Sequence, residues 1–171
     1  MRQLIKIISI CLIVNLHMPS AYSAISGGID YRIPIDYSVL NQTELANKAD
    51  KCYNEALLHN NGKLNDNITE GLNLYTMLTN KNPDNINYTL RLGKLYEIIG
   101  KNRQAKGCYY RAQNINPKSP EPYYYLGEYY FKREQYRKSL KMYLRASENG
   151  YSNHAKTTEK IGTLRRILGD M

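Results

Sequence analysis

The sequence predicts an all-α protein in which short helical hairpins stack one on the next. Leu92 and Gly93 recur 34 positions later as Leu126 and Gly127. Apolar residues return every three or four positions through most of residues 41–168, which is the spacing of amphipathic helices. A pattern that repeats at a fixed interval of this size is typical of stacked repeat proteins.

The most regular unit runs over residues 85–117 and predicts two amphipathic helices separated at Gly100. Asp84 or Asn85 is expected to cap the first helix. Gly93 is expected to be small because the two helices cross there, opposite Ala105. On the second helix, the apolar and small positions recur at the same interval: Ala105, Tyr109 and Ala112 return as Ser139, Tyr143 and Ala146.

A less regular hairpin precedes this unit. Asn41 and Glu44 have the spacing of a capping box, so a first helix is expected from Asn41 to near Asn60. Asn67 and Glu70 have the same spacing and predict the start of the second helix. Tyr75 precedes Tyr109 by one repeat interval, so this second helix is in register with the later repeats, whereas the first helix is not.

The third hairpin is expected to begin at Ser119-Pro120, with the proline in the first helical position, and to end at Gly150. A final helix starting at Ser152 or Asn153 has one apolar and one charged side. An amphipathic helix of this kind covers the exposed end of a repeat stack.

These repeated positions resemble the tetratricopeptide repeat (TPR) family over about residues 41–168. The resemblance implies a right-handed helical-hairpin solenoid of about three TPR units, at 41–83, 84–117 and 118–151, followed by a capping helix at 152–168. It also implies a protein-binding scaffold whose first helices line a concave groove. The residues carried over to that groove are Asn87, Leu90, Arg91, Lys94, Glu97, Ile98, Glu121, Tyr124, Tyr125, Glu128 and Phe131.

Within this set, Leu90 and Tyr124 occupy equivalent positions and form a candidate apolar contact patch. The alternative is that they pack on a neighbouring helix or on the preceding linker, whose apolar residues could themselves lie in the groove: Tyr31, Ile33, Ile35 and Tyr37. Some family members grip a partner's terminal carboxylate with basic groove residues. Glu121 and Tyr125 stand where that clamp needs basic residues, so recognition of a chaperone tail is not expected.

The net charge of +9 comes entirely from the C-terminal part of the chain, where residues 101–171 carry fifteen Lys and Arg against six Asp and Glu. Four of these recur every four residues and predict one basic stripe on the convex side: Arg133, Arg137, Lys141 and Arg145. The stripe is either a solvated helix face or a docking surface for an anionic membrane or acidic protein. Binding of nucleic acid is not expected.

Residues 1–23 resemble a secretory signal peptide: Arg2 and Lys6 precede an apolar run, and small residues lead to a cleavage site after Ser23. An extended linker is expected over 24–40. The domain would then be exported, either periplasmic or secreted. The alternative is an uncleaved N-terminal anchor.

No pattern for catalysis, a metal or a cofactor is present, and His59 and His154, which follow the leader, have no companion nucleophile or ligand motif. An enzyme is therefore not expected. The first hypothesis is an exported scaffold that helps to assemble an envelope or secretion component. The second is a basic protein that docks to an anionic membrane or polymer through its convex C-terminal face.

Overall fold

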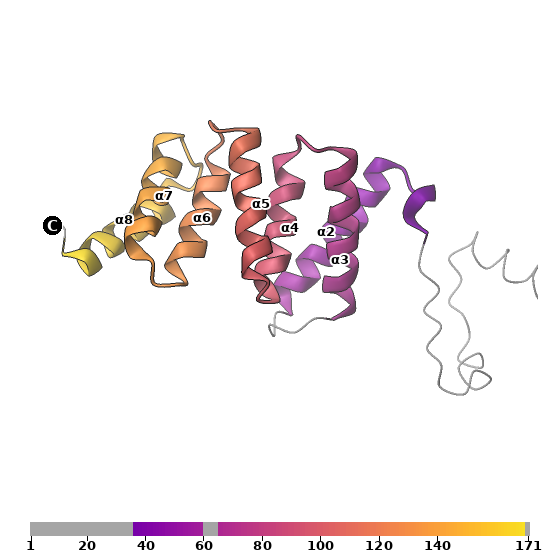
Figure 1. Ribbon diagram of the computed structural model, residues 1–171, viewed down its shortest axis with the longest axis horizontal. Coiled ribbons are helices and arrows are strands. Elements are labelled where there is room, and N and C mark those ends of the chain that lie inside the picture. The colour runs from indigo at the N-terminus through magenta and orange to yellow at the C-terminus, as the bar shows by residue number, and fades with distance from the viewer. Residues whose placement is uncertain (1–35, 60–64, 170–171) are drawn as a thin grey trace, which may run out of the picture. The chain divides into compact units, whose positions relative to one another are not determined.

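The fold is a row of helices that pack as antiparallel neighbours (Figure 1). The structure, a computed structural model, describes residues 36–59 and 65–169, and residues 37–169 fall in one structural unit. The predicted leader, 1–23, and all but the end of the linker lie outside the described residues. Within the described part of the chain, no helix is long and apolar enough to cross a membrane.

The described helices follow one another with short connections. They are η2 (Tyr37–Val39), α2 (Gln42–Leu58), α3 (Asp66–Lys81), α4 (Ile86–Ile98), α5 (Asn102–Ile115), α6 (Glu121–Phe131), α7 (Tyr136–Glu148) and α8 (His154–Leu168).

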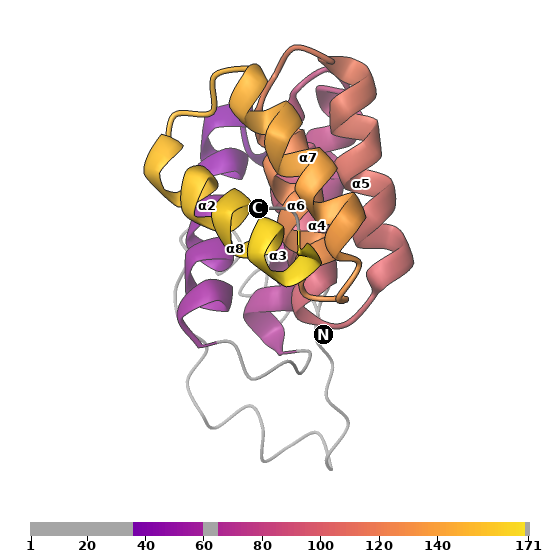
Figure 2. The same ribbon diagram turned by 90° about the vertical axis from the view of Figure 1, so that its left-hand side faces the viewer.

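Three hairpins are formed by α2 with α3, α4 with α5 and α6 with α7, and each hairpin packs on the next through its second helix. The last helix, α8, packs on α7. Viewed from the end of the row, α2 and α8 lie on one side and α5 on the other (Figure 2). The predicted helical-hairpin solenoid with a final capping helix is therefore confirmed.

The first hairpin begins as predicted and continues differently. Asn41 and Glu44 form the reciprocal capping box of α2. The cap of α3 is Asn65, whose side chain accepts from the amide of Ile68 at 2.8 Å, so the predicted Asn67–Glu70 box is wrong. Glu70 is used elsewhere: it accepts a hydrogen bond from the Tyr37 hydroxyl at 2.6 Å, which ties the end of the linker to this hairpin.

The ends of the later helices largely follow the predicted signals. Asn85 and Asn153 cap α4 and α8 with their side chains. Gly100 has a φ of +71°, and the amide of the following Lys101 reaches back to the Tyr96 carbonyl at 2.9 Å, which closes the helix end. Helix α6 starts one residue later than expected, at Glu121, and Ser119 donates to the Glu121 carboxylate instead of capping the backbone.

The two repeated glycines allow the helices of a hairpin to touch. A Cβ on Gly93 would lie 2.7 Å from the ring of Tyr109 and 2.9 Å from the Cβ of Cys108. A Cβ on Gly127 would lie 2.8 Å from the ring of Tyr143. The predicted requirement for a small residue is confirmed, but the close neighbour of Gly93 is Tyr109 rather than Ala105. Each glycine therefore makes room for a tyrosine ring.

Candidate partner-binding face

The first helices of the hairpins, together with α8, present one common face. On each helix, the residues at intervals of four, three and four positions point the same way. We call the surface formed by these rows the concave face: Ala46, Asp50, Tyr53 and Leu57 on α2; Asn87, Arg91, Lys94 and Ile98 on α4; Glu121, Tyr125, Glu128 and Lys132 at α6; and Lys156, Lys160, Thr163 and Ile167 on α8.

The first and third hairpins come near one another at this face. Burial, followed by the nearby Tyr125 on α6, raises the pKa of Tyr53 on α2.

Three tyrosines of the second helices reach through the hairpins to the concave face. Tyr75, Tyr109 and Tyr143 occupy equivalent positions of successive repeats, and each is fully buried. Each hydroxyl donates to a carboxylate on the first helix of its own hairpin. The acceptors are Asp50 for Tyr75, Glu97 at 2.8 Å for Tyr109 and Glu128 at 2.5 Å for Tyr143.

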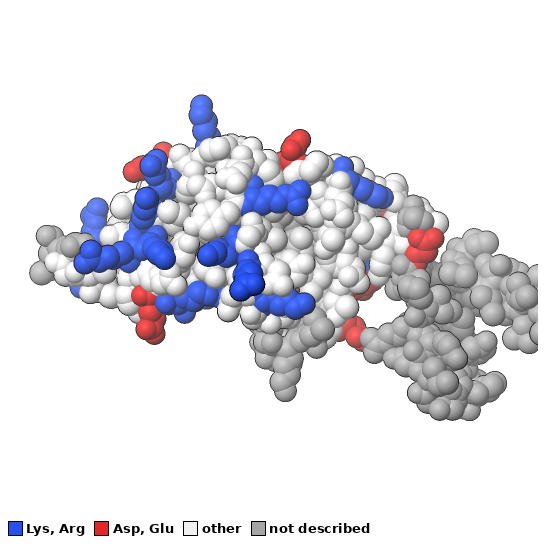
Figure 3. Space-filling view, viewed as in Figure 1, with Lys and Arg blue, Asp and Glu red and all other residues white. Residues whose placement is uncertain are grey.

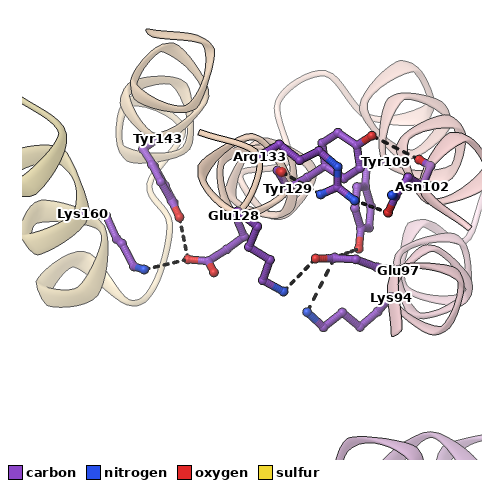
Figure 4. Close-up of polar contacts among 10 residues, drawn as sticks. Lys94, Glu97, Asn102, Tyr109, Glu128, Tyr129, Arg133, Tyr143 and Lys160 are labelled. Carbon is purple, nitrogen blue, oxygen red and sulfur yellow. Dashed lines mark hydrogen bonds and ion pairs between the residues drawn. The ribbon is translucent and has the colours of Figure 1, made fainter. Parts of the chain in front are cut away.

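Each of these carboxylates also pairs with a base from the next first helix or its end. Asp50 pairs with Arg91 on α4, Glu97 with Lys132 at 2.7 Å, and Glu128 with Lys160 on α8 at 3.6 Å. Figure 4 shows the second and third of these arrangements. We call the three sets the tyrosine–carboxylate–base contacts. They link each hairpin internally through the tyrosine and to its successor through the base.

Glu97 is the most buried of the three carboxylates, with 6% of its side chain exposed. Burial alone would raise its pKa, but hydrogen bonds from Lys132 and Tyr109 and the charge of Lys94 outweigh burial and lower the pKa. Burial and the adjacent Glu97 carboxylate raise the pKa of the Tyr109 phenol. Tyr109 therefore stays a neutral donor and Glu97 stays charged.

The pKa values of the two lysines beside Glu97 are shifted in opposite directions. Burial lowers the pKa of Lys94, although Glu97, 3.7 Å away, opposes this effect. For Lys132, the hydrogen bond to Glu97 outweighs burial and raises the pKa. Lys132 is also the more accessible of the two, with 49% of its side chain exposed. The cation that solvent meets at this point is therefore Lys132.

The prediction that Leu90 and Tyr124 form an exposed apolar contact patch is wrong. Leu90 is 3% exposed and packs in a cluster with Tyr109 and Leu126, and Tyr124 is 7% exposed and stacks on Tyr151 with ring centroids 4.3 Å apart. Both positions lie one residue before the outward-pointing row on their helix. Leu90 therefore faces the next hairpin, and Tyr124 faces Tyr151 and helix α8. The alternative prediction, packing on a neighbouring element, is the observed arrangement.

The other predicted groove residues divide between exposed and engaged positions. Asn87 is exposed, whereas Ile98 is buried in the core of the first two hairpins. Phe131 is half-buried under the ammonium group of Lys160, which lies 4.4 Å from the ring centroid. Tyr125 stacks on Tyr109 with ring centroids 5.5 Å apart. The structure thus brings Arg91, Lys94, Tyr125 and Glu128 together on the concave face, and Glu97 lies beneath it beside Lys94 and Lys132.

Several residues of this face were missed by sequence reasoning: Asp50, Tyr53, Lys132, Lys156 and Lys160. The irregular first hairpin hides Asp50 and Tyr53, because its first helix is out of register. The carboxylates are harder still, because Glu97 and Glu128 do not occupy equivalent repeat positions. The regular spacing of the three buried tyrosines was the one available signal for these contacts.

The predicted basic stripe is partly wrong. Arg133 precedes α7, and its guanidinium lies 3.7 Å from the ring centroid of Tyr129 and donates to the Tyr129 carbonyl and the Asn102 side chain (Figure 4). It joins the end of α6 to the start of α5. Arg137, Lys141 and Arg145 do lie on α7 and are exposed.

No cluster of metal-ligating side chains occurs among the residues that the structure describes. The candidate functional surface consists of tyrosines and paired charges. Such groups are suited to non-covalent recognition by hydrogen bonds and ion pairs.

The fold defined by these hairpins is that of the tetratricopeptide repeat. The crystal structure of MamA matches with a TM-score of 0.59 and 21% identity, over 75% of this chain and 64% of the MamA chain. This chain therefore spans less than two thirds of the length of MamA.

Two further solved structures have the same fold. The Sgt2 TPR domain from Aspergillus fumigatus matches with a TM-score of 0.57 and 20% identity, over 72% of this chain and 80% of that domain. The first TPR of Spaghetti (RPAP3), solved with the HSP90 peptide SRMEEVD, matches with a TM-score of 0.59 and 17% identity, over 76% of this chain and 97% of that one. No protein-family model and no curated protein matches the sequence.

Proposed function

We propose that this protein is an exported scaffold that holds a segment of a partner protein against its concave face and helps to assemble an envelope or secretion component. The partner segment is expected to carry Asp or Glu side chains. The observation that carries this proposal is the accessible charge of the concave face, which is mainly basic and lies beside tyrosine rings.

The basic character follows from unequal shielding. Glu97 and Glu128 are each held by a tyrosine and a lysine, and Glu128 is 21% exposed, so little of either carboxylate faces solvent. Lys132 is considerably more open, with 49% of its side chain exposed, and Lys156 is exposed. Arg91 and its partner Asp50 are about equally open, so this pair adds no net charge. A partner carboxylate can pair with these two lysines by charge-assisted hydrogen bonds, which are the strong class of such bonds. Tyr53 and Tyr125 supply flat apolar area beside them.

The solved TPR domain with a bound HSP90 peptide provides a precedent for peptide binding by this fold. It supports the class of function only. The clamp residues expected for a chaperone tail are not found here, because Glu121 and Tyr125 stand at those positions.

Site-specific photo-crosslinking tests the proposal and captures the partner directly. Asn87 on α4 and Asn73 on α3 are both exposed asparagines, but they lie on opposite sides of the row. Each is replaced by p-benzoylphenylalanine in the expressed full chain. We expect a discrete crosslinked protein from position 87 and none from position 73. Equal crosslinking from both positions, or none from position 87, would refute binding at the concave face.

Export is proposed from the leader-like sequence at residues 1–23, which is followed by the linker at 24–40. Mass spectrometry of the protein from fractionated cells provides the test. A periplasmic or secreted chain that begins after Ser23 is the expected result. A cytosolic chain that still begins at Met1 would contradict export.

A further inference from the structure

The second helices α5 and α7 carry a surface that the concave face does not use. Figure 3 shows Lys and Arg side chains across the side formed by α3, α5 and α7, with Asp and Glu near its margins. We call six exposed residues of α5 and α7 the basic array: Arg103, Lys106, Arg111, Arg137, Lys141 and Arg145.

Acidic residues are almost absent from these two helices. Helix α5 contains none, and α7 contains only Glu148, which lies 3.7 Å from Arg145 in an exposed pair. The other five members of the basic array form no ion pair with any residue that the structure describes. Helix α3 differs, because it contains one basic residue, Lys81, and two acidic residues, Asp66 and Glu70. Among the second helices of the hairpins, the unbalanced positive charge therefore lies on α5 and α7.

The array repeats from one hairpin to the next. Arg103 and Arg137 occupy equivalent positions of successive repeats, as do Arg111 and Arg145. Within each helix, the two arginines are eight residues apart, which is about 12 Å along the axis. Each helix therefore presents the same pair of guanidinium groups on its outer side.

An apolar side chain directly precedes the second arginine of each pair. Tyr110 on α5 is 38% exposed, and its equivalent on α7 is Leu144, which is half-buried. The hydroxyl of Tyr110 is already hydrogen-bonded to that of Tyr130, at 2.7 Å. The part of Tyr110 that solvent meets is thus mainly its ring.

We propose that this convex surface docks on an anionic phospholipid bilayer. Clusters of four to eight basic residues are attracted to anionic lipid, by about fivefold in partition coefficient per residue near the surface. Arginines interspersed with tyrosine and leucine suit the lipid–water interface. Nucleic acid is the less suitable partner, because a leucine cannot stack on bases as an aromatic ring does. The basic array shares no residue with the tyrosine–carboxylate–base contacts, so both faces can be occupied at once.

Vesicle sedimentation of the full chain tests this proposal. Vesicles of phosphatidylcholine alone are compared with vesicles containing phosphatidylglycerol and phosphatidylcholine at about 3:7, in about 0.1 M salt. We expect binding only to the anionic vesicles. The double variant Arg103→Gln/Arg137→Gln should lower the partition coefficient roughly 25-fold, because it removes two basic residues. Arg111→Gln/Lys141→Gln should act in the same way.

The matched control is Lys51→Gln/Arg166→Gln, which makes the same change in net charge at exposed positions of α2 and α8. It should retain binding within about twofold. Equal loss in the control and array variants would overturn the proposal, since only net charge would then matter. Equal binding to neutral vesicles would also overturn it. The proposal would also be overturned if the protein bound a short double-stranded DNA and no vesicles, and if the array variants abolished this DNA binding.

Discussion

At the scale of single residues, this molecule depends on three buried tyrosines and on the space that lets them pass between helices. Gly93 and Gly127 accept the rings of Tyr109 and Tyr143 at distances that exclude a Cβ. The same tyrosines end on carboxylates of the concave face. Each of these two tyrosines therefore packs against a glycine with its ring and donates a hydrogen bond to a carboxylate with its hydroxyl.

We predict that Gly93→Ala destabilises the protein by about 1–3 kcal/mol, because the added methyl group overlaps the ring of Tyr109. Gly107→Ala is the matched control, since nothing lies within 4 Å of a Cβ there. That change should stabilise helix α5 by about 0.5–1 kcal/mol. Urea unfolding followed by circular dichroism measures both. Two variants of equal stability would show that the close contact does not exist.

We predict that Glu97→Gln lowers stability by about 1–3 kcal/mol at neutral pH, because it leaves Lys132 and the Tyr109 hydroxyl without their charged partner. The pKa of Glu97 is lowered from its ordinary 4.5 in the folded state. Its stabilisation is therefore fully present above about pH 4.5 and is lost as the pH falls through the folded-state value.

The difference in unfolding free energy between wild type and Glu97→Gln should accordingly shrink as the pH is lowered toward 3, by the same linkage. Chemical unfolding at several pH values measures it. The exposed Glu159 supplies a control, and Glu159→Gln should change stability by less than about 0.5 kcal/mol at neutral pH. A Glu97 effect that is independent of pH would contradict the charged contact.

At the scale of the helices, the turns show how far repetition was preserved. Gly100 ends the first helix of the second hairpin with a φ of +71°, and the equivalent residue one repeat later is Glu134, with a φ of +56°. A left-handed backbone conformation costs a non-glycine residue about 1–2 kcal/mol. The third hairpin thus keeps the shape of the turn without the residue that suits it.

Replacing Glu134 by glycine should therefore raise the unfolding free energy by about 0.5–1 kcal/mol, after the greater freedom of glycine in the unfolded chain is subtracted. Gly100→Ala should have the opposite sign, with a loss of about 1 kcal/mol, because it forces alanine into the same conformation. Thermal unfolding measures both changes. If Glu134→Gly lost stability as well, the left-handed turn would not be a source of strain.

Much of the architecture was predictable from the sequence because the repeated positions are packing positions. The spacing of Tyr109 and Tyr143, the small Gly93 and the cap at Asn85 all follow from constraints within one hairpin. Positions whose environment depends on the element that follows the hairpin were not predictable in this way. Leu90 and Tyr124 belong to that group, since a single repeat viewed alone leaves them in solvent.

The polar contacts were less predictable for a related reason. Lys94 and Glu128 occupy equivalent positions but have opposite charges, and Glu97 is equivalent to Phe131. In both repeats a buried tyrosine contacts a carboxylate, but the carboxylate stands at a different repeat position in each. Periodicity in the sequence cannot reveal a contact that is conserved in space but not in position.

At the scale of the whole helical unit, the two faces carry different kinds of positive charge. On the concave face, bases are paired with carboxylates and lie beside tyrosines. On α5 and α7, most of the bases of the array are unpaired among the described residues. The first arrangement suits a shaped peptide segment, and the second suits a broad anionic surface. A scaffold with both could hold a partner close to a membrane.

The central claim is that the concave face binds Asp and Glu side chains of its partner. The segment crosslinked at position 87, made as a synthetic peptide, should be titrated calorimetrically beside a version with every Asp and Glu replaced by Asn and Gln. We predict that the neutral peptide binds at least about tenfold more weakly, because it cannot form ion pairs with Lys132 or Lys156. Equal affinity of the two peptides would contradict the account.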